Sequence, residues 1–187
     1  MKLLKYENAK LHNQLIFSIP ASQEICGRTC AGCYALKFQR LYPNVLPSRE
    51  RLYQASLQDD FVNLVTAEIQ SCKKPVIAIR IHESGEFYSQ EYINKWTAIA
   101  QALPNSSFYA FTKRLPDFDF SQLVALPNVA IINSLHTGKL NYDKLANLDP
   151  ALPICPATTI KAGCGTDCTF CFYKGQADVS SIQFVRH

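Results

Sequence analysis

Two groups of cysteines carry the residue types and spacing best suited to chemistry in this chain. Each has three cysteines separated by three and then two residues, in "CGRTCAGCY" near the start and "CGTDCTFCF" near the end. Three closely spaced thiolates can hold three irons of a [4Fe-4S] cluster and leave the fourth iron open, whereas four thiolates close the cluster. The sequence therefore predicts an open cluster at Cys26, Cys30 and Cys33 and a second, closed one at Cys155, Cys164, Cys168 and Cys171.

Zinc is the alternative metal, above all for the second group, because a closed four-cysteine site is a common way to staple a chain terminus. Zinc sites favour cysteine pairs separated by two residues, so the triplets fit iron–sulfur clusters better. A chain without bound metal is the third interpretation. The eighth cysteine, Cys72, ends an apolar segment and is interpreted as a buried structural thiol.

Length and composition limit the class of protein. The chain has 187 residues and is 48% hydrophobic, which predicts one domain, with a core over residues 1–150 and a cysteine-rich segment over 151–187. Its first residues lack the apolar run of a secretory signal, and no apolar stretch approaches the roughly 20 residues that span a bilayer. We expect a cytoplasmic protein with no membrane partner. The net charge of +4 permits nucleic acid as a partner without arguing for it.

The cysteines are embedded in alternating strand and helix patterns. Runs rich in β-branched and aromatic residues predict strands, and apolar residues three and four apart predict helices. The alternation is typical of βα units with parallel strands, so the predicted fold class is α/β. The predicted strands cover 13–20, 75–81, 106–113, 129–135 and 152–156, and the predicted helices 48–72, 88–103, 119–126 and 142–148.

Polar residues follow most of these strands, and the carboxyl ends of parallel strands are where ligands bind in such sheets. Side-chain alternation would put Arg80 and His82 on one face of their strand, where an arginine needs an anion. His82 is either a ligand or proton donor, or a histidine at a strand end whose hydrogen bonds are satisfied by backbone groups. Lys113 and Arg114 are equally compatible with a phosphate or carboxylate site and with surface charges.

The segment "CGRTCAGCYA" after a strand resembles the cluster loop of the radical S-adenosylmethionine (SAM) superfamily. This resemblance implies a partial βα barrel and an open cluster that binds SAM and cleaves it to a 5′-deoxyadenosyl radical after one-electron reduction. It places Tyr34 beside the cofactor. It also matches Ser84, Gly85 and Glu86 to the superfamily's Gly-Gly-Glu turn, which holds the SAM amine, and Asn133 and Ser134 to its ribose-binding position.

A narrower resemblance covers most of the chain. "CGRTCAGCYA", "RIHESGEFYSQEYINKW", "FYAFTKR" and the late cysteines together are similar to the phage gene product 88 domain family. This resemblance implies a phage, prophage or plasmid gene in a bacterial host and does not indicate a substrate.

Two classes of function follow. The first is a small radical SAM-like enzyme that takes electrons from a reductant such as flavodoxin or ferredoxin and modifies an unknown substrate, such as a nucleotide or nucleic acid. The second is a non-catalytic iron–sulfur or zinc protein with a regulatory, redox or nucleic-acid-binding role. Binding of SAM separates the two classes.

Overall fold

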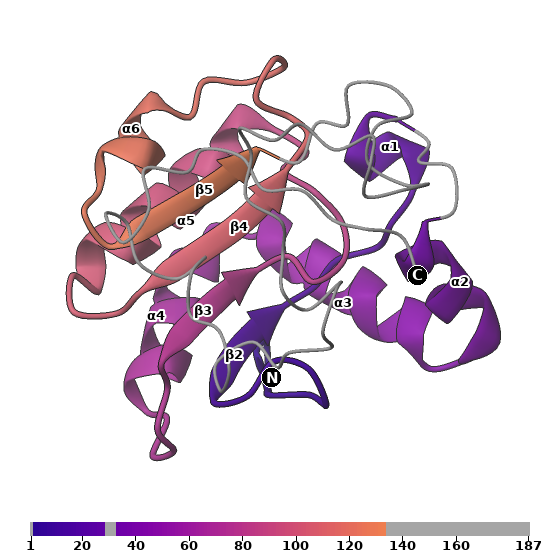
Figure 1. The fold of residues 1–187 in the computed structure, drawn as a ribbon, viewed down its shortest axis with the longest axis horizontal. Helices are drawn as coiled ribbons and strands as arrows, with labels where there is room; N and C mark the ends of the chain where they lie inside the picture. Colours follow the sequence, from indigo (N-terminus) through magenta and orange to yellow (C-terminus); the bar gives the residue numbers. More distant parts are fainter. Residues whose placement is uncertain (1, 29–32, 134–187) are drawn as a thin grey trace, which may run out of the picture.

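The computed structural model describes residues 2–28 and 33–133, which form a five-stranded sheet with its strands in sequence order, β1-β2-β3-β4-β5 (Figure 1). The four strands β2 to β5 run parallel, as the sequence predicts, whereas β1 pairs antiparallel to β2. Sequence reasoning missed β1, because two residues are too few to show an alternating pattern. The strands are β1 Lys5–Tyr6, β2 Gln14–Phe17, β3 Ala78–Ile81, β4 Phe108–Thr112 and β5 Val129–Asn133. Two predicted elements, over 142–148 and 152–156, lie outside the described residues.

Helices connect the parallel strands, and α4 and α5 lie behind the sheet (Figure 1). Their inward side chains and one face of β2 to β5 form the main hydrophobic core, in which Phe17, Phe61 and Trp96 meet edge to face. The helices are α1 Gln23–Cys26, α2 Tyr34–Leu41, α3 Val45–Leu57, α4 Phe61–Gln70, α5 Gln90–Ala102 and α6 Ser121–Ala125.

The single helix predicted over 48–72 is wrong. The chain forms α3 and α4 there, because Gln58 takes an extended conformation and ends α3. The break lets Leu52 and Phe61 both reach the core, which one straight helix would not allow. Helix α3 also begins before the predicted start at Ser48, with Pro47 in its first turn, where a missing N–H costs nothing.

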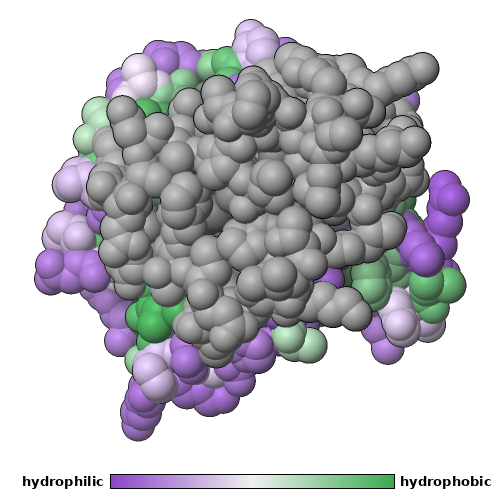
Figure 2. All heavy atoms as spheres, in the orientation of Figure 1, coloured by the Kyte–Doolittle hydropathy of each residue, from purple (hydrophilic) through white to green (hydrophobic). Residues whose placement is uncertain are grey.

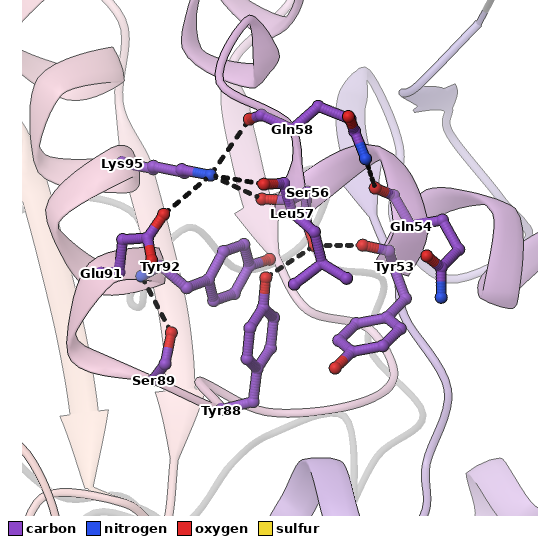
Figure 3. Close-up of polar contacts among 10 residues, drawn as sticks. All are labelled: Tyr53, Gln54, Ser56, Leu57, Gln58, Tyr88, Ser89, Glu91, Tyr92 and Lys95. Atoms are coloured by element: carbon purple, nitrogen blue, oxygen red, sulfur yellow. Dashed lines mark hydrogen bonds and ion pairs between the residues drawn. The ribbon is translucent and has the colours of Figure 1, made fainter.

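Lys95 of α5 binds backbone oxygens at the C-terminal end of α3 (Figure 3). Its ammonium group donates to the backbone oxygens of Ser56, Leu57 and Gln58 at 3.2, 3.2 and 3.0 Å. These oxygens belong to the last turn of α3 and the residue after it, where carbonyl groups lack helical partners and favour a cation. The ion pair with Glu91 at 3.2 Å is a weaker addition, since Glu91 is 75% exposed.

Replacing Lys95 by methionine keeps an unbranched side chain and removes the ammonium group. We expect Lys95→Met to lower the free energy of unfolding by about 1–3 kcal/mol, because hydrogen bonds from a charged donor are lost. The matched control Glu91→Gln should cost less than about 1 kcal/mol. Urea denaturation measures both changes, and equal losses in the two variants would contradict the role assigned to the carbonyl contacts.

Helix α2 has an unusually apolar outer face. Phe38 and Leu41 are 46% and 59% exposed, and Phe38 stacks on Tyr42 with ring centroids 5.6 Å apart. Figure 2 shows hydrophobic atoms among hydrophilic ones at the edge of the molecule where Figure 1 draws α2.

In the part of the chain that is described, no helix is long and apolar enough to cross a membrane.

Candidate functional site

The loops that follow β2 and β3 are joined to each other at the carboxyl edge of the sheet. The N–H of Ile19 donates to the oxygen of Ser84 at 3.0 Å, and the N–H of Glu83 donates to the oxygen of Phe17 at 3.2 Å. A cleft of about 120 Å³ lies between these loops and the start of α2. It is lined by Ala21, Cys26, Arg28, Cys33, Tyr34, Ala35, Glu83, Ser84, Gly85, Glu86 and Lys113.

The cleft brings two cysteines of the first group together with the predicted Ser-Gly-Glu turn. Cys26 is the last residue of α1, Cys33 directly precedes α2, and both are half-buried. Cys30, between them, lies outside the described residues, as do Cys155, Cys164, Cys168 and Cys171. Within residues 2–28 and 33–133, no three His, Cys, Asp or Glu side chains gather as a metal site.

Tyr34 joins the cysteine loop to the β3 loop. It is the first residue of α2, its side chain lines the cleft, and its hydroxyl donates to the backbone oxygen of Glu83. This bond fixes the start of α2, and with it Cys33, against the loop after β3.

Gly85 allows the two loops to meet. Its φ of 87° lies in the left-handed region, and a Cβ atom there would sit 2.4 Å from Cγ1 of Ile19 and about 3 Å from two backbone oxygens. Beside it, Ser84 lines the cleft, and its buried hydroxyl has no hydrogen-bond partner among the described residues. Most buried hydroxyls in proteins have such a partner, so this one is a candidate for contact with a ligand.

The Glu86 carboxylate is buried at the cleft and tied to the end of β4. Oε2 accepts from the Thr112 hydroxyl at 2.7 Å and from the N–H of Phe87 at 3.3 Å, and Oε1 accepts from the N–H of Lys113 at 2.8 Å. Burial raises the pKa of Glu86, while the bonds from Thr112, Lys113 and Phe87 and the nearby Lys113 charge oppose that rise. A carboxylate has about four acceptor positions, so these bonds leave one on Oε1.

Of the predicted ribose-binding pair, Asn133 lies farther along the same edge of the sheet. Asn133 ends β5 and is the register partner of Thr112, which binds Glu86. It does not line the cleft. Ser134 lies outside the described residues.

The expectation that Arg80 and His82 share a face is wrong. Arg80 stacks on Tyr109 and Phe111, on the sheet face away from the main core, whereas His82 packs against Phe87 and Tyr92 within it. The strand ends at Ile81, and His82 has a φ of 66°, so the alternation of side chains is broken at this point. The His82 Nε2 atom bonds the Tyr92 hydroxyl at 2.9 Å, and the ring does not line the cleft.

Burial, and to a smaller extent the charge of Arg80, lower the pKa of His82 to about 3. The unfolded chain, with an ordinary pKa of 6.5, therefore binds a proton before the folded chain does. Stability is full above pH 6.5 and is lost as the pH falls toward the folded pKa.

As the pH falls from 7 to 5, protonation of His82 in the unfolded chain should lower the free energy of unfolding by about 2 kcal/mol. Asparagine tolerates the backbone conformation of His82 and does not titrate, so His82→Asn should show a smaller loss over this range. Urea denaturation at several pH values tests this, and an equal loss in both proteins would contradict it.

Sequence reasoning missed two residues of this site, Arg28 and Glu83. Arg28 lines the cleft and its guanidinium lies 3.3 Å from the Asp117 carboxylate. Glu83 reaches the cleft while its side chain accepts from Asn8 at 2.8 Å. The only available signals were that Arg28 lies within the first cysteine loop and that Glu83 directly precedes the Ser-Gly-Glu turn.

Comparison with known proteins identifies a protein family and a relative encoded by a phage. The family described as Gene product 88 matches residues 2–150. The chain is 28% identical, over 106 residues, to the Gene 88 protein of Mycobacterium phage L5. That match covers 52% of this chain and 43% of the phage protein, so the chain spans less than half of its relative. No solved structure matches the chain.

Proposed function

The chain belongs to the Gene product 88 family, whose match includes the cleft residues, and we propose that this cleft binds an iron–sulfur cluster and SAM. The protein is then a small radical SAM-like enzyme built on a partial βα barrel. The consecutive order of the parallel strands β2 to β5 is compatible with that fold. The observation that carries the proposal is the convergence of Cys26, Cys33 and the Ser84–Glu86 turn on one cleft.

The residues present fit both groups. Cys26 and Cys33 would supply thiolates from either side of the loop that contains Cys30, and the second cysteine group would hold a second cluster or zinc. The one open acceptor position of Glu86 suits an amine, and the unpartnered Ser84 hydroxyl suits a polar group of the same ligand.

When bound and reduced, a three-cysteine cluster with SAM supplies a 5′-deoxyadenosyl radical. Residues of this chain would position the groups that bind the cluster and SAM. Thr112 and the Lys113 N–H fix the Glu86 carboxylate, and Tyr34 fixes the wall that carries Cys33. An orientation held by such bonds keeps the reacting atoms in place without reorganisation.

The test is the iron, sulfide and zinc content of anaerobically purified full-length protein, with EPR of the reduced sample before and after SAM is added. About eight irons per chain and a signal that changes with SAM are expected. Iron without a response to SAM would overturn the enzyme and leave the non-catalytic iron–sulfur protein. Zinc without iron, repeated after cluster reconstitution, would overturn both.

A further inference from the structure

We infer that a groove between β1, β2 and the start of α3 binds a free α-amino acid with an aliphatic side chain. The groove has a volume of about 290 Å³ and shares only Glu83 with the cleft described above. It is therefore a second site, which the proposed function does not use. Sites for drug-sized molecules measure roughly 300–1,000 Å³, so this groove suits a smaller ligand.

The lining of the groove carries charges of both signs, from Lys5, Arg49 and Glu83. Burial lowers the pKa of the Arg49 guanidinium, and the charge of Glu83 opposes this fall, so the two groups lie within electrostatic reach of each other. They nevertheless form no direct ion pair. A zwitterion between them would place its carboxylate at Arg49 and its ammonium group at Glu83. Lys5, which is exposed, adds attraction for the carboxylate.

The Arg49 guanidinium is held in place and still has donors available. Its Nη1 atom donates to the backbone oxygen of Ala35 at 3.1 Å and to Oε1 of Gln39 at 3.0 Å. Its Nε and Nη2 atoms have no hydrogen-bond partner among the described residues. Two N–H groups on one edge of a guanidinium match the two oxygens of a carboxylate, so this edge suits the carboxylate of an amino acid.

Glu83 and Ser18 provide acceptors for an ammonium group. Oε1 of Glu83 accepts from Nδ2 of Asn8 at 2.8 Å, and Oε2 has no partner in the described part of the chain. Ser18, the residue after β2, also lines the groove, and its buried hydroxyl has no hydrogen-bond partner among the same residues. An ammonium group has three N–H donors, which these two side chains would help to satisfy.

Three aliphatic side chains, those of Ile16, Val45 and Leu52, belong to the same lining. Ile16 and Leu52 are buried and Val45 is half-buried. None of the described residues that line the groove is aromatic. The ligand's own side chain would contact these aliphatic groups, and burial of apolar surface favours a side chain such as that of leucine over a polar one.

The test titrates L-leucine into the full-length protein by calorimetry near neutral pH and compares two analogues. Isocaproate lacks the ammonium group of leucine, and isopentylamine lacks the carboxylate. We expect each analogue to bind about tenfold more weakly than L-leucine, because each loses hydrogen bonds to a charged partner. Absence of L-leucine binding, or equal binding of L-leucine and either analogue, would overturn the inference.

Two variants assign the two charges of the ligand. Glu83→Gln should weaken L-leucine binding about tenfold without weakening isocaproate binding, because isocaproate has no ammonium group for Glu83 to bind. Arg49→Lys keeps the charge but loses the paired donors, so it should weaken L-leucine and isocaproate and leave isopentylamine unchanged. Glu83→Gln, which keeps a side-chain oxygen for Asn8, maintains the test if Arg49→Lys fails to fold.

The matched control is Arg40→Gln on α2, an exposed arginine outside the groove, which should leave L-leucine binding unchanged. Equal weakening by Arg40→Gln would overturn the assignment of the groove. SAM also carries an α-amino acid group, so L-leucine is titrated again with SAM present. Unchanged affinity is expected for a second site, and competition by SAM would overturn it. The first titrations need neither iron nor SAM, so their failure is distinguishable from failure of the proposed function.

Discussion

Cys26→Ala is expected to lose about four irons per chain and all SAM-dependent change in the EPR signal, while the second cysteine group keeps its metal. Cys26 ends α1 and lines the cleft, so its thiolate is one of three that would hold the open cluster. A cluster bound by the remaining two cysteines lacks an anchor for one of its irons. The measurement is iron and sulfide content together with EPR, on protein purified without oxygen.

Cys72→Ala is the matched control. Cys72 is half-buried at the edge of the main core, where its thiol lies 3.9 Å from the backbone oxygen of Lys74, and it is remote from the first cysteine group in sequence. This variant should keep the full iron content. Retention of all iron by Cys26→Ala, or equal loss in Cys72→Ala, would refute the assignment of the open cluster to the first group.

Gly85→Ala is expected to lower the free energy of unfolding by about 2–5 kcal/mol. Part of this loss comes from the left-handed backbone, which costs a residue with a Cβ atom about 1–2 kcal/mol. The rest comes from overlap with Ile19, whose Cγ1 atom lies 2.4 Å from the position of the new Cβ and whose backbone oxygen lies 3.0 Å away. Because Ile19 also bonds Ser84, the variant should separate the loops that form the cleft.

Gly27→Ala provides the comparison. Gly27 has a similar φ of 69°, but its Cβ atom would meet the end of the flexible Arg114 side chain and not backbone. The Arg114 side chain can move aside at the cost of its contact with Asp117, so we expect a smaller loss of stability than for Gly85→Ala. Urea denaturation measures both variants, and a greater loss in Gly27→Ala than in Gly85→Ala would contradict the account of the loop contact.

These variants separate two requirements of the cleft. Gly85 allows the loops after β2 and β3 to contact each other, and Cys26 is proposed to bind the iron–sulfur cluster in the cleft that these loops form. Glu86 belongs to both requirements, because its carboxylate ties the β3 loop to the end of β4 and also faces the cleft.

The amino-acid sequence by itself determined the parallel strands and the position of the cleft. The apolar run that ends in "AIRI" and the pattern of "FYAFT" each predict a buried strand, and both strands lie within the sheet. Parallel strands place their carboxyl ends at one edge, so the cysteine loop and the Ser84–Glu86 turn were expected to converge, as Cys26 and Cys33 do with that turn. These patterns are local, and local patterns survive folding when the core supports them.

Only the tertiary structure decided the break between α3 and α4, the orientation of His82 and the partners of the charged residues. The break depends on packing of two helices against one core, and His82 leaves its strand through a positive φ that alternation does not indicate. Asp117 lies 89 positions from Arg28 and still pairs with it. Contacts between side chains so far apart in sequence depend on how the fold brings the two loops together. The residue pattern within either loop does not indicate this arrangement.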